Sequence, residues 1–199
     1  MDEAIKFLLP ITILVVPIIV LVQQYREAER KLQEAWTAFA GARGLEYLPP
    51  KGRVGHRIEG TFEGARVEIS LLRVKRGYLP VPYTRVTTSL KDPLEARVDV
   101  ISDRALEHLG ALQGKPDVLV GDPVFDTKFL IRSSHEDDAK GLLDNLLRRS
   151  LTAFPQPSLA FLHGGSKVEL LWHGREHAAG ALDAACRIVV GALRWRGRV

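Results

Sequence analysis

A long uncharged apolar run near the start of the chain constrains its fold more than any other feature. Residues 7–22 hold thirteen Leu, Ile, Val or Phe residues among sixteen positions, and none of the sixteen is charged. A helix of this length rises about 24 Å, and the preceding residues with a snorkelling Lys6 bring it near the roughly 30 Å of a bilayer core. We therefore expect residues 1–23 to form a transmembrane anchor that contacts the lipid bilayer through residues 5–22.

The residues on either side of this run favour an uncleaved anchor and set its orientation. Asp2 and Glu3 precede it where a secretory signal would carry basic residues, and no small-residue cleavage pattern follows it. Arg26, Arg30 and Lys31 lie just after it. Because cytoplasmic flanks carry the excess of Lys and Arg, we expect a single-pass protein of the inner (plasma) membrane with a cytoplasmic C-terminal domain.

Apolar residues keep a 3-4 spacing beyond the run, which predicts a juxtamembrane helix over residues 24–44 that ends at Gly41 and Gly44. Two uses of this apolar stripe remain open. It can form the seam of a parallel homodimer, or it can pack with Trp36 against the domain that follows. The seam positions are Tyr25, Leu32, Ala35 and Phe39.

The remaining residues, 51–199, predict one cytoplasmic α+β domain. A tight-hairpin signal at Glu63-Gly64-Ala65 and another at Gly164-Gly165-Ser166 separate alternating apolar segments. We expect strands over 58–62, 66–72, 83–90, 96–101, 128–132, 158–163 and 167–172, and helices over 103–110, 134–151 and 176–193. The predicted fold is an N-terminal transmembrane helix continuing into a juxtamembrane helix, then a mainly antiparallel sheet packed by two C-terminal helices.

The sharpest chemical pattern is His173-Gly174-Arg175-Glu176-His177, which matches the H-x-x-E-H motif of inverzincins. Two histidines four apart on a helix can hold one metal ion, and the intervening Glu can act as a base. The segment just before the motif predicts a strand, however, so the first histidine is not expected on a helix. A zinc-dependent hydrolase, with His173 and His177 as ligands and Glu176 as catalytic residue, is an alternative; we expect no cofactor.

A second pair of acids lies in the loop Gly121-Asp122-Pro123-Val124-Phe125-Asp126. Asp122 and Asp126 are low-priority catalytic candidates, since two carboxylates four residues apart can hold a cation or transfer protons. The opposing interpretation is structural, because Asp-Pro opens turns and an Asp side chain bonds its own backbone.

Basic residues gather in a loop and at the C-terminal end. On a domain tethered at a membrane, such residues favour contact with anionic lipid or another polyanion, but no nucleic-acid-binding motif accompanies them, so nucleic acid is not the expected partner. The residues are Arg73, Lys75, Arg76, Arg194, Arg196 and Arg198.

The acidic loop, followed by Phe129 and Ile131, resembles a segment of uncharacterised bacterial single-pass membrane-anchored proteins that share a Gly-Asp-Pro-x-Phe-Asp loop and carry a domain of unknown function. The Trp36–Gly44-Leu45 segment, the Gly60 to Gly64 hairpin and the strand Tyr83-Thr84-Arg85-Val86 add to this resemblance, which covers residues 36–150. The resemblance implies no catalytic residue.

These patterns together predict a membrane-tethered interaction or scaffold domain with an unidentified protein partner, and a homodimer as one form of it. We do not expect an enzyme. The alternatives are the zinc-dependent hydrolase and an anionic-lipid or nucleic-acid surface binder that uses the basic loop and tail.

Overall fold

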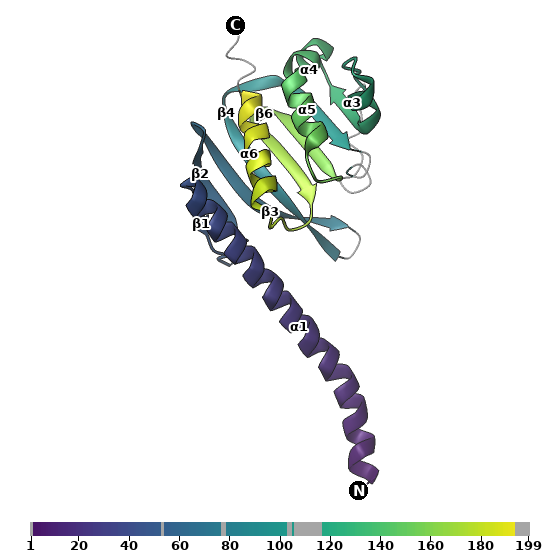
Figure 1. The fold of residues 1–199 in the computed structure, drawn as a ribbon. Helices are drawn as coiled ribbons and strands as arrows, with labels where there is room; N and C mark the ends of the chain where they lie inside the picture. The colour runs from purple at the N-terminus through teal and green to yellow at the C-terminus, as the bar shows by residue number, and fades with distance from the viewer. Residues whose placement is uncertain (1, 53, 77–78, 103–104, 106–116, 194–199) are drawn as a thin grey trace.

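The computed structural model of the chain describes residues 2–52, 54–76, 79–102, 105 and 117–193 (Figure 1). The strands are β1 (Glu46–Leu48), β2 (Arg57–Phe62), β3 (Ala65–Arg76), β4 (Leu79–Ser102), β5 (Phe129–Ser133) and β6 (Leu159–His173). The helices are α1 (Asp2–Arg43), α3 (Pro123–Lys128), α4 (Glu136–Leu142), α5 (Asn145–Ala153) and α6 (Ala179–Leu193). The helix expected over 103–110 falls on residues outside the described ranges except for Ala105, which is buried.

The described strands form one antiparallel sheet. Its order is β1-β2-β3-β4-β5, and β6 pairs with β4. The hairpin expected at Glu63-Gly64 joins β2 to β3, and both turn residues have positive φ angles of 47° and 87°. Such angles are those of a type I′ turn, whose twist matches that of the paired strands. The α+β class and the mainly antiparallel sheet are therefore confirmed.

Two of the expected strand breaks are wrong. β4 runs unbroken through residues 83–101, and β6 runs unbroken through the expected hairpin at Gly164-Gly165-Ser166. The glycines mark an irregular stretch of pairing between β4 and β6, where the register shifts between Ser89 and Val98. A Cβ on Gly164 would lie 2.9 Å from the Cα of Arg97 across the sheet, so the glycine permits close approach of two strands rather than a turn.

The helix expected over residues 134–151 is two helices. α4 ends at Leu142, and Asp144 then opens α5 by accepting a hydrogen bond from the Leu147 backbone N–H at 2.8 Å. An Asp at this position offers the backbone a new helix start, which the leucine periodicity alone does not reveal. The N-cap of α4 is His135, and its side chain makes no capping hydrogen bond.

The larger of two clusters of buried hydrophobic residues joins the sheet to the helices on one of its faces. Figure 1 shows α6 lying across the strands and α1 reaching the sheet only with its C-terminal part. Ile69, Val86 and Leu170 from the sheet belong to the same buried cluster as Leu182 of α6 and Trp36 of α1. The hydrophobic core of the sheet therefore includes residues well before position 51.

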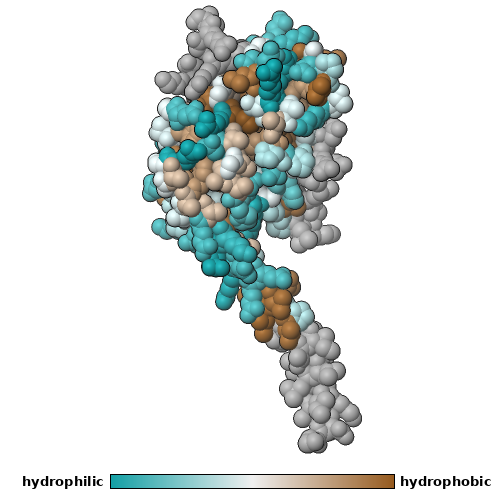
Figure 2. Space-filling model, in the orientation of Figure 1, coloured by the Kyte–Doolittle hydropathy of each residue, from teal (hydrophilic) through white to brown (hydrophobic). Residues whose placement is uncertain are grey.

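The prediction of a single-pass anchor in the inner membrane is wrong. Over the ranges that the structure describes, no helix has an apolar stretch long enough to cross a bilayer. The described apolar side chains of α1 from Val16 to Val22 are followed at once by Gln23, Gln24 and Arg26, which interrupt the stretch. Figure 2 shows these apolar side chains on the projecting part of α1, next to a strongly hydrophilic stretch. The helix expected over 24–44 is present as the second half of α1, which ends at Arg43.

Candidate functional site

Polar side chains from four segments meet where α1 reaches the sheet, and we call this group the junction cluster: Glu29, Tyr47, His56 and Arg175. Glu29 of α1 accepts a bond of 2.6 Å from Arg175, which lies in the loop between β6 and α6. Its other oxygen lies 2.7 Å from His56 Nε2, and His56 Nδ1 lies 2.6 Å from the Tyr47 hydroxyl. Arg175 also lies over the ring of Tyr25, 5.4 Å from its centroid. The cluster thus connects α1 with β1, with the residue that precedes β2 and with the loop between β6 and α6.

The environment of Glu29 fixes its charge. Burial on its own would raise the pKa of this carboxyl, but hydrogen bonds from Tyr25, His56 and Arg175, with the positive charge of Arg175, lower the pKa to about 2. Burial, and then the nearby Glu29 carboxylate, raise the pKa of Tyr47 above its ordinary value. At neutral pH the cluster therefore holds an ionised Glu29 and a protonated Tyr47.

The order Glu29, His56, Tyr47 has the connectivity of a carboxylate–imidazole–hydroxyl relay. A nucleophile in such a relay is activated when its pKa is lowered. The pKa of the Tyr47 phenol is raised instead, which opposes that role. His56 has only 5% of its surface exposed. The geometry therefore suits a structural contact that holds α1 against the sheet better than it suits a catalytic centre.

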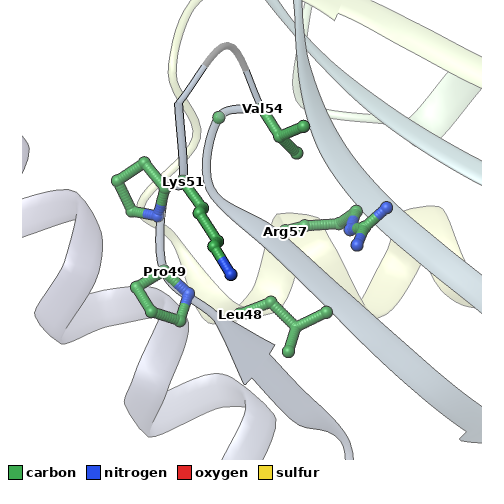
Figure 3. Close-up of a pocket in the computed structure, with 7 residues that line it drawn as sticks. Leu48, Pro49, Lys51, Val54 and Arg57 are labelled. Atoms are coloured by element: carbon green, nitrogen blue, oxygen red, sulfur yellow. The ribbon is translucent and has the colours of Figure 1, made fainter.

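A pocket lies in the chain segment between β1 and β2 (Figure 3). It has a volume of about 450 Å³ and is formed where β1 gives way to β2. The lining residues are Leu48, Pro49, Pro50, Lys51, Val54, Gly55 and Arg57. Tyr47 and His56 adjoin this set in sequence, so the pocket and the cluster both use the chain segment that runs from β1 to the start of β2.

The H-x-x-E-H residues do not lie on a helix. His173 ends β6, the next five residues are irregular, and α6 begins at Ala179. Both Glu176 oxygens are used within the protein: Oε1 accepts from the backbone N–H groups of His177 and Ala178, and Oε2 accepts from Gln156 and Trp172. Glu176 therefore holds the entry to α6 in place. The helical geometry that the zinc-site prediction needs is absent from this described segment.

The two carboxylates of the acidic loop accept hydrogen bonds from nearby backbone N–H groups. Asp122 is the N-cap of α3 and accepts from the Phe125 N–H at 3.2 Å. The Asp126 carboxylate accepts from three successive backbone N–H groups, those of Val120, Gly121 and Asp122, at 3.0–3.1 Å. Carboxylates bound in this way fold a loop around themselves. The structural interpretation of this loop agrees with the geometry.

The remaining predicted site residues are partly buried in the core, partly exposed and partly outside the described side chains. In the apolar stripe of α1, Leu32 and Phe39 are buried in the core, Ala35 packs against it, and Tyr25 is 54% exposed. The stripe thus covers the chain's own sheet from Leu32 onward, which was the second of its two expected uses. Arg73 is exposed on β3, whereas the side chains of Lys75 and Arg76 and the three tail arginines are not among those described. Contact with lipid or polyanions stays a prediction.

Within the described ranges, His, Cys, Asp and Glu side chains form no group of three that could hold a metal ion. Cys186 is fully buried in α6, and burial raises the pKa of its thiol to about 12. It is therefore a core residue that stays protonated at neutral pH.

The residues of the junction cluster could not be found from the sequence. Glu29 and His56 lie 27 positions apart, and Glu29 and Arg175 lie 146 apart. No motif has such spacing. The one available signal is that Glu29 and Tyr25 occur on the helix whose apolar stripe faces the sheet.

Comparison with known proteins finds a solved structure of similar fold. The chain matches no protein-family model and no curated protein. It is similar to the crystal structure of the mycobacterial trehalose monomycolate transport factor A, TtfA, with a TM-score of 0.59. The match has 15% sequence identity and covers 83% of this chain and 96% of that one. At this low sequence identity, the match shows a similarity of fold alone.

Proposed function

We propose that this protein is a non-enzymatic interaction domain that serves as an accessory factor in a transport process. The observation that carries the proposal is the shared fold with TtfA, a transport factor, over 96% of the TtfA chain. The arrangement of the described side chains supports it, because the acids and histidines that sequence patterns nominate for chemistry are bonded to the backbone or lie outside any cluster.

The form of α1 supports a role in contacting a partner. Its second half is fixed to the sheet by the junction cluster and by Trp36, whose indole N–H donates to the Glu176 carbonyl at 2.8 Å. Its preceding residues project from the domain (Figure 1) and expose large apolar side chains, including Ile18 at 52% and Leu21 at 64%. A contiguous exposed apolar surface is typical of an interaction site.

Site-specific photo-crosslinking in living cells tests this function. A photo-reactive phenylalanine analogue at Leu21 should give discrete adducts with another protein, and mass spectrometry should identify that protein as part of a transport system. The same analogue at Arg149, an exposed position on α5, is the control and should give no such adduct. Equal adducts from both positions, or none from either in cells that express the protein at its natural level, would overturn the proposal.

A further inference from the structure

The pocket between β1 and β2 is lined by two consecutive prolines and by described residues of the turn that follows them. Pro49 and Pro50 have fixed φ angles and form one wall. The turn that follows is closed by two backbone hydrogen bonds, from Lys51 N–H to the Val54 carbonyl at 3.0 Å and from Val54 N–H to the Lys51 carbonyl at 3.1 Å. The two prolines have little backbone freedom to lose when a ligand binds, which favours binding.

The pocket wall is mostly apolar. Leu48, Pro49, Pro50 and Val54 supply the apolar part, and Val54 keeps 53% of its surface exposed. An exposed β-branched side chain beside two prolines offers contact area to an apolar chain. The volume of about 450 Å³ lies in the range of small-molecule sites.

The charge of the pocket is positive. Two cations, Lys51 and Arg57, border it (Figure 3). Arg57 is compensated, because its Nε lies 2.8 Å from the Glu59 carboxylate. The ion pairs between described side chains include none for Lys51, whose side chain extends along the opening beside Leu48 in Figure 3. One uncompensated positive charge thus borders an apolar surface.

We propose that this pocket binds a small anionic amphiphile, with its carboxylate or phosphate head at Lys51 and its alkyl part against Leu48, Pro49, Pro50 and Val54. Among the described residues, the lining contains no aromatic side chain for stacking a base and no carboxylate or amide side chain for bonding a sugar. These features disfavour nucleotides and neutral sugars as ligands. The inference does not depend on the proposed transport role, because it uses the pocket alone.

The test uses octyl phosphate, held below its micelle concentration, and the isotope-labelled full chain. The backbone amide signals of Gly55, which lines the pocket, and of Gly52, in the adjoining turn, should shift in a saturable way as octyl phosphate is added. Inorganic phosphate and octyl glucoside separate the two parts of the ligand and should each bind at least about fivefold more weakly, because each lacks one contact. If inorganic phosphate binds as well as octyl phosphate, the site reads only the anion and the proposal is wrong. If octyl glucoside binds as well, the site reads only the chain, and the proposal is equally wrong.

Two charge-reversal variants complete the test. Lys51→Glu replaces the attraction by repulsion and should weaken octyl phosphate binding about five- to tenfold while leaving the binding of octyl glucoside unchanged. Lys167→Glu is the matched control: this exposed lysine lies on β6, three strands away from β2, and its reversal should leave octyl phosphate binding unchanged. Thermal unfolding of both variants verifies that the fold is kept. Equal loss of binding in the two variants would show a general effect of net charge and overturn the assignment to Lys51.

Discussion

At the scale of single residues, Glu29 is the side chain on which the junction cluster depends. It bonds both Arg175 and His56, and only 25% of its side chain is exposed. Glu29→Gln should lower the free energy of unfolding by about 1–3 kcal/mol, because Arg175 and His56 lose their charged partner in a partly buried place. Urea unfolding measures the change. Glu34→Gln is the matched control, since the Glu34–Arg30 pair is exposed on the same helix, and it should change stability by at most about 0.5 kcal/mol.

The same residue predicts how stability depends on pH. The pKa of Glu29 is lowered in the folded protein from 4.5 to about 2. A lowered pKa means that the stabilisation is fully present above about pH 4.5 and is lost as the pH falls toward 2. The difference in unfolding free energy between the native protein and Glu29→Gln should therefore shrink steadily through this window. A difference that stays constant down to the lowest pH at which the protein folds would contradict the assigned pKa.

Residue patterns predicted local roles well and distant partners poorly. Trp36 was expected to pack beside the apolar stripe in one of its two uses, and it is fully buried there. Asp122 was expected to bond its own backbone in the structural interpretation, and it does. The bonding partners of His56 and Tyr47 could not be predicted from the sequence. These residues meet Glu29 only when the sheet brings the chain around β1 and β2 beside α1. Their roles follow from tertiary structure that no short window contains.

At the scale of elements, the β4–β6 pair shows how a turn signal can be misleading. Two glycines and a serine in a row predict a hairpin, yet here they let a long strand pass close to its neighbour. The pattern of alternating apolar residues on either side is the same in both cases. What differs is the partner strand, β4, which lies far earlier in the chain and whose pairing is irregular at the same level, where Leu94 pairs with Gly165. Leucine periodicity likewise predicted one helix where Asp144 separates two.

Gly164 provides the prediction at this scale. A Cβ added there would lie 2.9 Å from both Cα and Cβ of Arg97, and a backbone atom cannot move away cheaply. Gly164→Ala should therefore destabilise the protein by about 1–3 kcal/mol, the usual cost of overpacking. Gly191→Ala is the control, because a Cβ there meets nothing within 4 Å on the exposed side of α6, and it should be neutral or stabilising by up to about 1 kcal/mol. Denaturant unfolding distinguishes the two, and equal effects would contradict the close approach of β4 and β6.

At the scale of the whole molecule, α1 has two parts with different duties. The first part projects beyond the sheet and exposes apolar side chains, whereas the second closes the core with Leu32, Trp36 and Phe39, each at most 4% exposed. The sequence indicated both the helix and its stripe, but it placed the start of the domain after the helix. The apolar stripe alone does not distinguish packing against another chain from packing against the sheet that follows, because either partner would offer it an apolar surface.

This division predicts the outcome of two truncations. Removing residues 2–22 deletes side chains that are exposed wherever the structure describes them, so the remaining chain should unfold cooperatively within a few degrees of the full protein. Removing residues 2–43 deletes Leu32, Trp36 and Phe39, each worth about 1.5–3 kcal/mol when buried, together with Glu29 of the junction cluster. That loss is comparable to the whole free energy of unfolding of a typical domain, which is about 5–15 kcal/mol. The shorter chain should therefore fail to fold. Circular dichroism during heating measures both, and a cooperative transition in residues 44–199 alone would show that α1 is an appendage rather than part of the core.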